Sequence, residues 1–286
     1  MEFLRPDGLP DVLEARAAHP GALPLMGGTD VMVALNFDRR RPDALLDLTR
    51  APELTAWDHV DGMVRLGAGV TYSRVIDELA TELPGLAIAS RTVGSPQIRN
   101  RGTVGGNLGA ASPAGDSHPA LLAGFAEVEL ASRDGVRRVP VDEFFTGVKQ
   151  HAGRGDELVT AVWIRPATGP QQFSKIGTRN AMVIAVTSFG LALHPDREQV
   201  GTGLGSAAPT PRRARDAEEF LGAELDWSAR RDIRDSVAAE FARLVATAAS
   251  PIDDVRGTAA YRRHALAVMA RRCLSWAWAE HQGRRH

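Results

Sequence analysis

Two pairs of adjacent glycines, each beside a threonine, constrain the fold of this chain more than any other feature of its sequence. Residues 27–28 follow an apolar run and precede Thr29, and residues 105–106 lie between Thr103 and Asn107. Because glycine has no Cβ, the N–H groups of such a turn can approach an anion closely, and a threonine hydroxyl adds a donor. One pair alone is more often a tight bend. Two pairs that converge predict a cradle for a pyrophosphate.

Nucleotide-binding and catalytic motifs of other kinds are missing from the sequence. No Gly-x-Gly-x-x-Gly opens a helix after a strand, and no Gly-x-x-x-x-Gly-Lys-Ser/Thr occurs, which argues against a Rossmann domain and a P-loop ATPase. No Gly-x-Ser-x-Gly elbow marks a serine hydrolase. The histidines are scattered, and neither His-Glu-x-x-His nor Cys-x-x-Cys occurs, so we expect no metal in this chain.

The single cysteine, Cys273, limits what the chain can hold. It excludes an internal disulfide, which favours a reducing compartment, and it excludes an iron–sulfur cluster held by this chain alone, because such clusters usually need four thiolates. No signal-peptide pattern opens the chain and no apolar run reaches about 18 residues, so we expect a cytoplasmic protein without a membrane partner. With 34 basic and 35 acidic residues, no nucleic-acid partner is expected.

Hydrophobic periodicity and turn residues predict a mixed succession of helices and strands up to a boundary at residues 166–170. The expected elements are a helix at 11–19, strands at 23–26 and 44–48, a hairpin around Asp61-Gly62, a helix capped by Thr71 and ended by Pro84-Gly85, a hairpin around Asp134-Gly135, and a strand at 158–164. A long glycine-rich stretch at 94–115 follows the helix that Thr71 caps, and it is the most informative part of the sequence.

Beyond the boundary, the sequence predicts a short sheet followed by helices. The expected elements are strands at 173–176 and 183–193, a small-residue segment at 201–211, and helices at 211–221, 229–249 and 256–280. In the last helix, Leu266, Met269, Cys273 and Trp276 recur at spacings of three and four, which predicts one apolar face. The arginines at 262, 263, 271 and 272 are expected on a solvated or subunit-facing surface opposite that face.

Residues 98–116, Ile-Arg-Asn-Arg-Gly-Thr-Val-Gly-Gly-Asn-Leu-Gly-Ala-Ala-Ser-Pro-Ala-Gly-Asp, resemble the signature of FAD-binding subunits in the xanthine dehydrogenase and carbon monoxide dehydrogenase family of molybdenum hydroxylases. Residues 25–30 match the first flavin-binding turn of that family. Residues 175–182, 205–211 and 254–263 resemble further family blocks, so the resemblance covers nearly the whole chain. Within the family, the runs at 95–101, 180–186 and 251–257 look most like bacterial xanthine dehydrogenase FAD-binding subunits.

The resemblance implies an α+β fold of two domains. Residues 1–168 would form a two-lobed FAD-binding domain of the vanillyl-alcohol oxidase and PCMH type, with a small α/β lobe at about 1–53 and a larger, hairpin-rich lobe at about 54–168. Residues 169–286 would form a small C-terminal α+β flavoprotein domain, a short antiparallel sheet packed with helices. About 115 residues beyond Pro170 are too few for the substrate-capping domain of a single-chain flavin oxidase, an alternative with the same FAD-binding fold.

The resemblance also implies roles for particular residues. Backbone amides of both glycine turns would hold the FAD pyrophosphate, Asp116 would accept hydrogen bonds from FAD hydroxyl or adenine groups, and Lys175 would lie near the isoalloxazine ring and favour an anionic reduced flavin. The alternatives are a helix N-cap for Asp116, a solvated strand position for Lys175 and a plain core position for Leu158. The expected FAD-binding residues are Leu25, Met26, Gly27, Gly28, Thr29, Asp30, Thr103, Val104, Gly105, Gly106, Asn107, Asp116, Leu158 and Lys175.

By the same resemblance the substrate is oxidised elsewhere, on a molybdopterin-binding large subunit. Electrons would cross two [2Fe-2S] clusters on a small subunit, reach this FAD, and pass to NAD+ or another acceptor, with xanthine or hypoxanthine as the expected substrate. No residue of this chain would be an acid or base in catalysis. The alternatives are a subunit for carbon monoxide, nicotinate or an aromatic substrate, and a stand-alone FAD carrier or regulatory protein.

Overall fold

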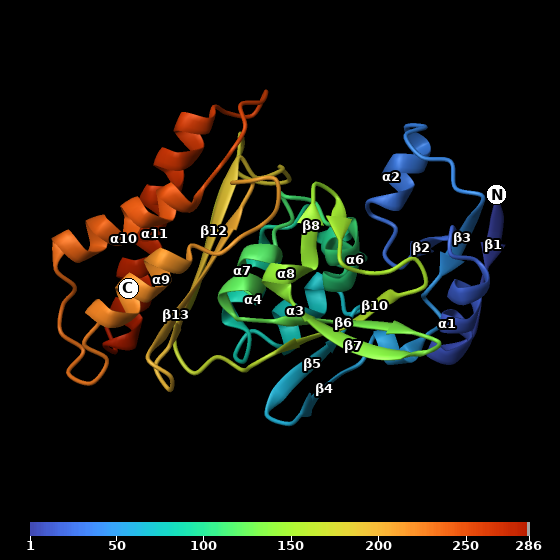
Figure 1. The fold of residues 1–286 in the computed structure, drawn as a ribbon, viewed down its shortest axis with the longest axis horizontal. Coiled ribbons are helices and arrows are strands. Elements are labelled where there is room, and N and C mark those ends of the chain that lie inside the picture. The colour runs from blue at the N-terminus through green and yellow to red at the C-terminus, as the bar shows by residue number, and fades with distance from the viewer. Residues whose placement is uncertain (285–286) are drawn as a thin grey trace.

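The computed structural model describes residues 1–284 as three main sheets that follow one another along the molecule (Figure 1). The first is a small parallel sheet of order β1-β3-β2, at the N-terminal end. Its strands are β1 (Glu2–Leu4), β2 (Leu23–Leu25) and β3 (Ala44–Asp47), with α1 (Gly8–Ala18), α2 (Val31–Asn36) and a 3-10 turn (Pro52–Leu54) around them. Every residue of β3 is buried, which agrees with its place in the centre of a parallel sheet.

The second sheet is antiparallel, in the order β4-β5-β10-β6-β7. Its strands are β4 (Trp57–Val60), β5 (Met63–Gly67), β6 (Glu127–Ser132), β7 (Gly135–Pro140) and β10 (Leu158–Ile164). Helices α3 (Tyr72–Glu78), α4 (Pro84–Arg91), α5 (Pro96–Arg99), α6 (Val104–Ala110) and α7 (His118–Ala123) connect β5 to β6. Helix α8 (Val141–Phe144) and the two-stranded sheet of β8 (Phe145–Gly147) and β9 (Gln150–His151) complete this part.

A buried glutamate organises the middle of the second sheet. The Glu129 carboxylate accepts hydrogen bonds from Arg65, at 2.7 Å, from Thr160, at 2.8 Å, and from the Trp163 indole, at 2.7 Å. Burial alone would raise the pKa of this carboxyl group, but these donors hold it below its usual value. The three strands β5, β6 and β10 are thereby tied together by one ionised side chain.

The third sheet is β11 (Gln171–Ile176), β12 (Thr187–His194) and β13 (Gln199–Gly205), all antiparallel. Helices α9 (Arg215–Glu224), α10 (Asp235–Ala248) and α11 (Ala259–His281) cover one face of it, and α7 and α4 of the preceding part lie against the other (Figure 1). The expected α+β organisation is therefore present. Strand β10 ends at Ile164 and β11 begins at Gln171, on either side of the expected boundary.

Strand β13 was not expected from the sequence, which contains mainly glycine and small residues there. Its glycines allow α7 to approach closely: a Cβ on Gly201 would lie 2.0 Å from the carbonyl oxygen of Ala123, and one on Gly203 would lie 2.1 Å from that of Pro119. Gly190 on β12 meets Pro119 in the same way, at 2.6 Å. The backbone of α7 thus packs directly against β12 and β13, because glycines leave no side chain at these contacts.

Other sequence expectations are corrected by the packing. Pro84 begins α4 instead of ending the preceding helix, because its missing N–H is harmless in a first turn. Trp276 is partly exposed, and Trp278 is the buried tryptophan of α11. Arg262 is also buried: it donates to Asp254 Oδ1 at 2.6 Å and to the Ser206 carbonyl at 3.1 Å, which compensates its charge.

Candidate functional site

The two glycine pairs lie side by side in the structure. A Cβ on Gly27 would lie 2.0 Å from the carbonyl oxygen of Arg101 and 3.2 Å from the Cα of Gly102, the residues that lead into the second pair. Gly28 has φ +76°, a left-handed conformation that favours glycine. The first turn therefore needs both of its glycines, and the convergence expected from the sequence is present.

The first turn offers free backbone donors. Within residues 1–284, the N–H groups of Gly27, Gly28, Thr29 and Asp30 have no hydrogen-bond acceptor. These residues are half-buried or exposed, and they join the end of β2 to the start of α2. Several adjacent N–H groups without partners form a concave, positive surface that suits a phosphate.

The second pair differs from the turn that the sequence suggested, because it forms the first turn of α6. The amide of Gly105 donates to the Ala68 carbonyl at 3.0 Å, and the amide of Gly106 donates to Thr103 Oγ1 at 2.9 Å. A Cβ on Gly105 would lie 2.3 Å from that of Ala68, so the glycine is required by packing. Both amides already have acceptors, and Val104 is fully buried. The second pair therefore shapes the cradle instead of lending its amides.

Donors on this side come from side chains. Thr103 Oγ1 accepts from the Gly106 amide, which leaves its own hydrogen free to donate. Asn107 Oδ1 accepts from Ser117 Oγ at 2.7 Å, so its NH₂ group remains available. Ser117, which orients Asn107, carries no signal in the sequence beyond following Asp116.

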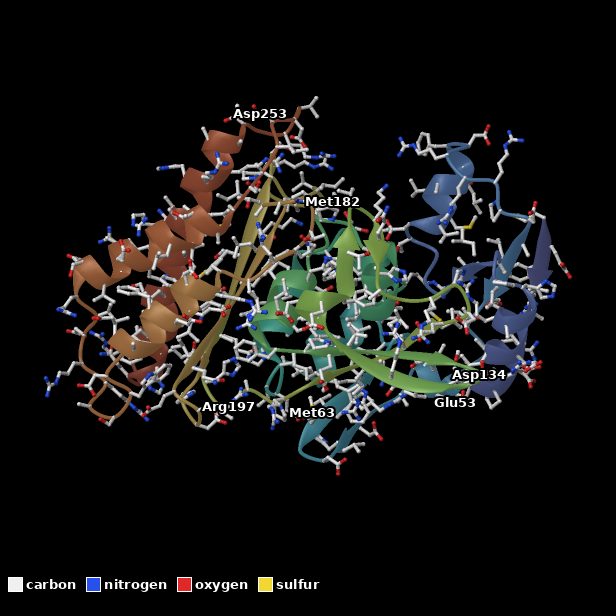
Figure 2. All side chains as sticks on the ribbon, in the orientation of Figure 1. Glu53, Met63, Asp134, Met182, Arg197 and Asp253 are labelled. Atoms are coloured by element: carbon white, nitrogen blue, oxygen red, sulfur yellow. The ribbon has the colours of Figure 1, made fainter. Side chains whose placement is uncertain are left out.

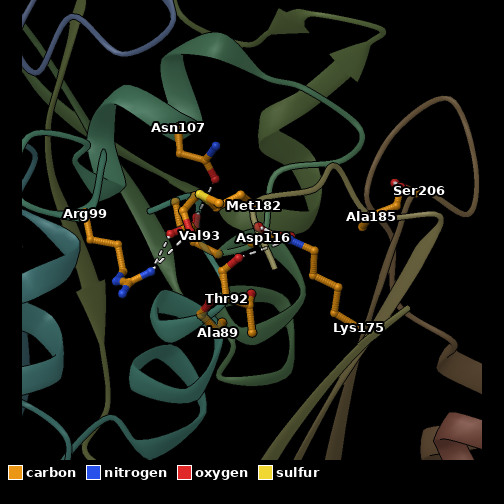
Figure 3. Close-up of polar contacts among 12 residues, drawn as sticks. Ala89, Thr92, Val93, Arg99, Asn107, Asp116, Lys175, Met182, Ala185 and Ser206 are labelled. Atoms are coloured by element: carbon orange, nitrogen blue, oxygen red, sulfur yellow. Dashed lines mark hydrogen bonds and ion pairs between the residues drawn. The ribbon is translucent and has the colours of Figure 1, made fainter. Parts of the chain in front are cut away.

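Asp116 and Lys175 meet across the boundary between the second and third sheets (Figure 3). Lys175 Nζ lies 2.7 Å from Asp116 Oδ2 and donates to the Thr92 carbonyl at 3.2 Å. The Lys175 side chain is only 8% exposed and the Asp116 side chain only 11%. Lys175 is therefore not a solvated strand lysine. Asp116 is not a helix cap either, since Ser117 occupies the N-cap position of α7.

The other oxygen of this carboxylate is left over. Asp116 Oδ1 is buried and has no hydrogen-bond partner. Burial raises the pKa of Asp116 to about 6, although the neighbouring Lys175 ammonium acts to lower it. An unpartnered buried carboxylate oxygen costs free energy unless a donor reaches it. The site therefore lacks one hydroxyl or N–H donor that a ligand would supply.

Two of the other expected residues, Leu158 and Met26, belong to hydrophobic packing of the N-terminal part. Leu158 is buried in the core cluster that also contains Val12, Leu46 and Leu54, with Met26 packed against it. Met26 also occupies the space above Gly69, where a Cβ would lie 2.2 Å from its methyl group. Leu158 is thus a core residue, in the cluster against which Met26 of the first turn packs.

Taken together, these residues fit FAD. Free amides and two side-chain donors suit a pyrophosphate, and the buried Asp116 oxygen suits a hydroxyl donor of the same ligand. A separate cavity of about 810 Å³, lined by residues such as Phe125, Arg197 and Arg213, shares no residue with this cradle. The cradle has unpaired donors, whereas Arg213 in that cavity is paired with Glu218 at 2.5 Å.

The part of the chain that the structure describes shows neither a metal-binding cluster nor a helix that could span a membrane. No group of three or more His, Cys, Asp or Glu side chains there could hold a metal ion. None of the helices within residues 1–284 combines the length and the apolar character that a membrane span needs.

Comparisons with known proteins confirm the resemblance and the two-domain α+β fold. Residues 1–167 match the FAD binding domain in molybdopterin dehydrogenase, and residues 172–277 match the CO dehydrogenase flavoprotein C-terminal domain. The chain is 30% identical to the xanthine dehydrogenase FAD-binding subunit of Escherichia coli O157:H7, covering 96% of this chain and 95% of that one. It is also 30% identical to the nicotine 6-hydroxylase medium subunit of Paenarthrobacter nicotinovorans, with 96% of each chain covered.

Solved structures agree with these matches. A carbon monoxide dehydrogenase chain from Oligotropha carboxidovorans superposes with a TM-score of 0.90 at 26% identity and 98% coverage of both chains. A chain of the enzyme from Hydrogenophaga pseudoflava gives 0.89 at 26% identity, with 98% of this chain and 97% of that one covered. The free amides, the unpartnered carboxylate and these matches over the whole length lead to one assignment. The chain belongs to the family of FAD-binding flavoprotein subunits of molybdopterin dehydrogenases.

Proposed function

We propose that the FAD pyrophosphate lies over the free amides of residues 27–30, facing Thr103 and Asn107, and that the flavin end of the cofactor lies toward Asp116 and Lys175. The observation that carries this placement is the buried Asp116 oxygen without a partner, beside a nearly buried lysine. The domains would divide at residues 168 and 169, with lobes at about 1–53 and 54–168. The cofactor would then contact both domains.

The chain's own residues bind and position the cofactor. Bound FAD supplies the redox chemistry, by accepting electrons and delivering them to an acceptor. Lys175 would place a positive charge beside the flavin end of bound FAD, and Asp116 holds that ammonium at 2.7 Å. The two glycine pairs, at 27–28 and 105–106, keep side chains away from the proposed pyrophosphate position. No residue is required to transfer a proton.

The assembly we propose has a molybdopterin-binding large subunit and a small subunit with two [2Fe-2S] clusters. The single cysteine supports this division, because this chain cannot supply four thiolates. We propose xanthine or hypoxanthine as the substrate and NAD+ as the acceptor. The similarity to a xanthine dehydrogenase FAD-binding subunit supports this choice, and the equal similarity to a nicotine 6-hydroxylase subunit makes an aromatic substrate the alternative.

Purification from the native host tests the proposal. We expect flavin and iron–sulfur absorption bands together with molybdenum, and xanthine-dependent reduction of NAD+. If carbon monoxide, nicotinate or another aromatic compound drives NAD+ reduction instead, that compound would replace xanthine as the proposed substrate. A protein that runs alone with FAD, without iron or molybdenum, would instead be a stand-alone carrier.

FAD affinity is expected to rise with pH through about 6. Asp116, with its pKa raised to about 6, must lose its proton before both oxygens can accept hydrogen bonds. Binding a donor favours the ionised form, so affinity increases as the carboxyl group ionises and levels off above its pKa. Between pH 5 and pH 7 the gain would be about tenfold. Titration of the FAD-free chain with FAD, followed by flavin fluorescence, measures it.

The variant Asp116→Asn is expected to bind FAD more weakly at pH 7 and to lose this pH dependence, since an amide does not titrate in the range. Asp134→Asn, on the exposed hairpin between β6 and β7, is the matched control and should keep the wild-type profile. A wild-type pH profile in Asp116→Asn would remove Asp116 from the FAD site.

A further inference from the structure

A cluster of buried polar side chains lies against Asn107. Ser117 and His118 are both 0% exposed, and Tyr72 is 3% exposed. Tyr72 Oη and His118 Nδ1 have no hydrogen-bond partner among the residues that the structure describes. Burial of a polar side chain costs free energy unless it is hydrogen-bonded, so a cluster of this kind next to a ligand site indicates a specific role.

Ser117 fixes the side-chain amide of Asn107. Its Oγ donates to Asn107 Oδ1 at 2.7 Å, so the amide oxygen is occupied and the NH₂ group lies on the opposite side. Figure 3 shows Asn107 with a bond at its oxygen and with its nitrogen free. An asparagine amide can present either its oxygen or its NH₂ group to a ligand, and this bond selects the orientation that offers donors to a phosphate.

His118 fixes the backbone of the same residue. The Ala111 amide, which would serve the Asn107 carbonyl in a longer α-helix, donates to the Leu108 carbonyl instead. His118 Nε2 donates to the Asn107 carbonyl at 3.2 Å. Burial lowers the pKa of His118 to about 4, so the ring is neutral near pH 7 and carries its one ring proton on Nε2.

Packing holds the start of α7 in place. A Cβ on Gly115 would lie 2.2 Å from His118 Cε1, so the glycine leaves the space that the imidazole fills. The centroid of the Phe145 ring lies 4.6 Å from that of His118. Pro119, the next residue, packs against β13, where a Cβ on Gly203 would lie 2.1 Å from the Pro119 carbonyl oxygen. The first residues of α7 therefore cannot shift without the loss of contacts on more than one side.

Tyr72 reaches the cluster from α3. Its amide donates to the Gly102 carbonyl at 3.1 Å, and a Cβ on Gly102 would lie 3.4 Å from the edge of its ring. Burial raises the pKa of Tyr72, and the neighbouring Ser117 hydroxyl acts to lower it. Ser117 Oγ already donates to Asn107, so toward Tyr72 it can only accept. This arrangement favours a chain in which Tyr72 donates to Ser117 and Ser117 donates to Asn107, and each bond of such a chain strengthens the next.

We propose that Tyr72, Ser117 and His118 are positioning residues for FAD, which hold Asn107 with its NH₂ group toward the pyrophosphate. This inference rests on the proposed FAD function. None of the three side chains touches the cofactor, and their effect on it passes through Asn107. A donor that is held in place binds a phosphate more tightly than a mobile one, because less side-chain freedom is lost on binding.

A double-mutant cycle on FAD affinity tests the proposal in the full chain. We expect Ser117→Ala and His118→Leu each to weaken FAD binding about tenfold and Tyr72→Phe about threefold, since each removes one hydrogen bond that holds Asn107. In a chain that already carries Asn107→Ala, the same changes should alter the affinity less than about twofold, because the residue through which they act is gone. A residue that only supports the fold would keep its full effect in that background.

The matched control is Tyr261→Phe, because Tyr261 is the other tyrosine of the chain and is 47% exposed. It lies in the first turn of α11, where the Ala259 amide donates to Asp253, at an outer edge of the C-terminal part (Figure 2). We expect wild-type FAD affinity and melting temperature from this control. If His118→Leu lowers the melting temperature so far that the chain unfolds, the two hydroxyl variants still test the proposal.

Failure of this proposal can be told apart from failure of FAD binding itself. A wild-type chain that binds no FAD overturns the proposed function and the positioning role with it. If the wild type binds FAD and Asn107→Ala binds it equally well, FAD binding stands and the positioning role is overturned. The positioning role alone also fails if the changes at Ser117 and Tyr72 have no effect, or if they keep their full effect in the chain without Asn107.

Discussion

Gly27→Ala is expected to abolish tight FAD binding. The new Cβ would lie 2.0 Å from the carbonyl oxygen of Arg101 and 2.7 Å from its carbonyl carbon, far inside contact distance. The obstruction is backbone, so it cannot rotate away, and relief requires the turn at residues 27–30 to move off the second motif. Losing two hydrogen bonds from backbone N–H groups to a pyrophosphate costs about 3 kcal/mol or more, which weakens FAD binding at least ~100-fold.

The matched control is Gly109→Ala, in α6 of the second motif. No atom lies within 4 Å of a Cβ there, and alanine favours a helix over glycine. We expect this variant to bind FAD as the wild type does and to be slightly more stable. FAD titration of both chains measures the difference, and equal affinity of Gly27→Ala and Gly109→Ala would contradict the proposed pyrophosphate position.

Gly203→Ala is expected to loosen the third sheet from the rest of the molecule. A Cβ at this position would lie 2.1 Å from the carbonyl oxygen of Pro119 and 2.6 Å from its carbonyl carbon, where α7 crosses β13. Forcing one methyl group into such a contact costs about 1–3 kcal/mol. For a chain of this size that corresponds to a fall in melting temperature of ~3–10 °C.

A second readout follows from the position of Lys175 on the displaced sheet. If α7 and β13 separate, Lys175 moves away from Asp116, so FAD affinity should fall together with stability. Gly155→Ala, in a turn where nothing lies within 4 Å of a Cβ, is the control. Wild-type melting temperature in Gly203→Ala would show that α7 can shift without loss, against the close packing described above.

Strands with alternating or continuous apolar residues were predictable from the sequence. The strand expected at 158–164 is β10 without a change of bounds, and the hairpin around Asp134-Gly135 joins β6 and β7. Asp61 and Gly62 both have positive φ, as a two-residue hairpin turn requires. These elements are specified locally, by turn residues and by side chains that face the core.

Elements specified by a distant neighbour were not predictable in this way. Strand β13 is glycine-rich because α7 lies against it, and a glycine-rich segment alone reads as a loop. Arg262 was expected on a solvated face, but it is buried and donates to Asp254 and to the Ser206 carbonyl. Periodicity also favoured Trp276 over Trp278, although only the latter reaches the core.

The candidate site also combines features that were predictable from the sequence with features that depend on packing. The two glycine pairs beside threonines predicted converging segments, and the structure brings them together because a Cβ on Gly27 would collide with Arg101. The use of the Gly105 and Gly106 amides by Ala68 and Thr103 depends on packing, and the sequence could not reveal it. The 2.7 Å contact between Asp116 and Lys175 joins residues 59 positions apart, on elements whose relative placement only the structure gives.

That contact also bears on the order of events during biosynthesis. The two glycine motifs and Asp116 leave the ribosome well before Lys175, which is ordered only when β11 pairs with β12. A nascent chain that ends before residue 194 would hold the pyrophosphate surface but lack the fixed ammonium and the sheet that supports it. The complete cofactor surface would therefore form only once the third sheet has been made, and chains truncated within that sheet would bind FAD weakly.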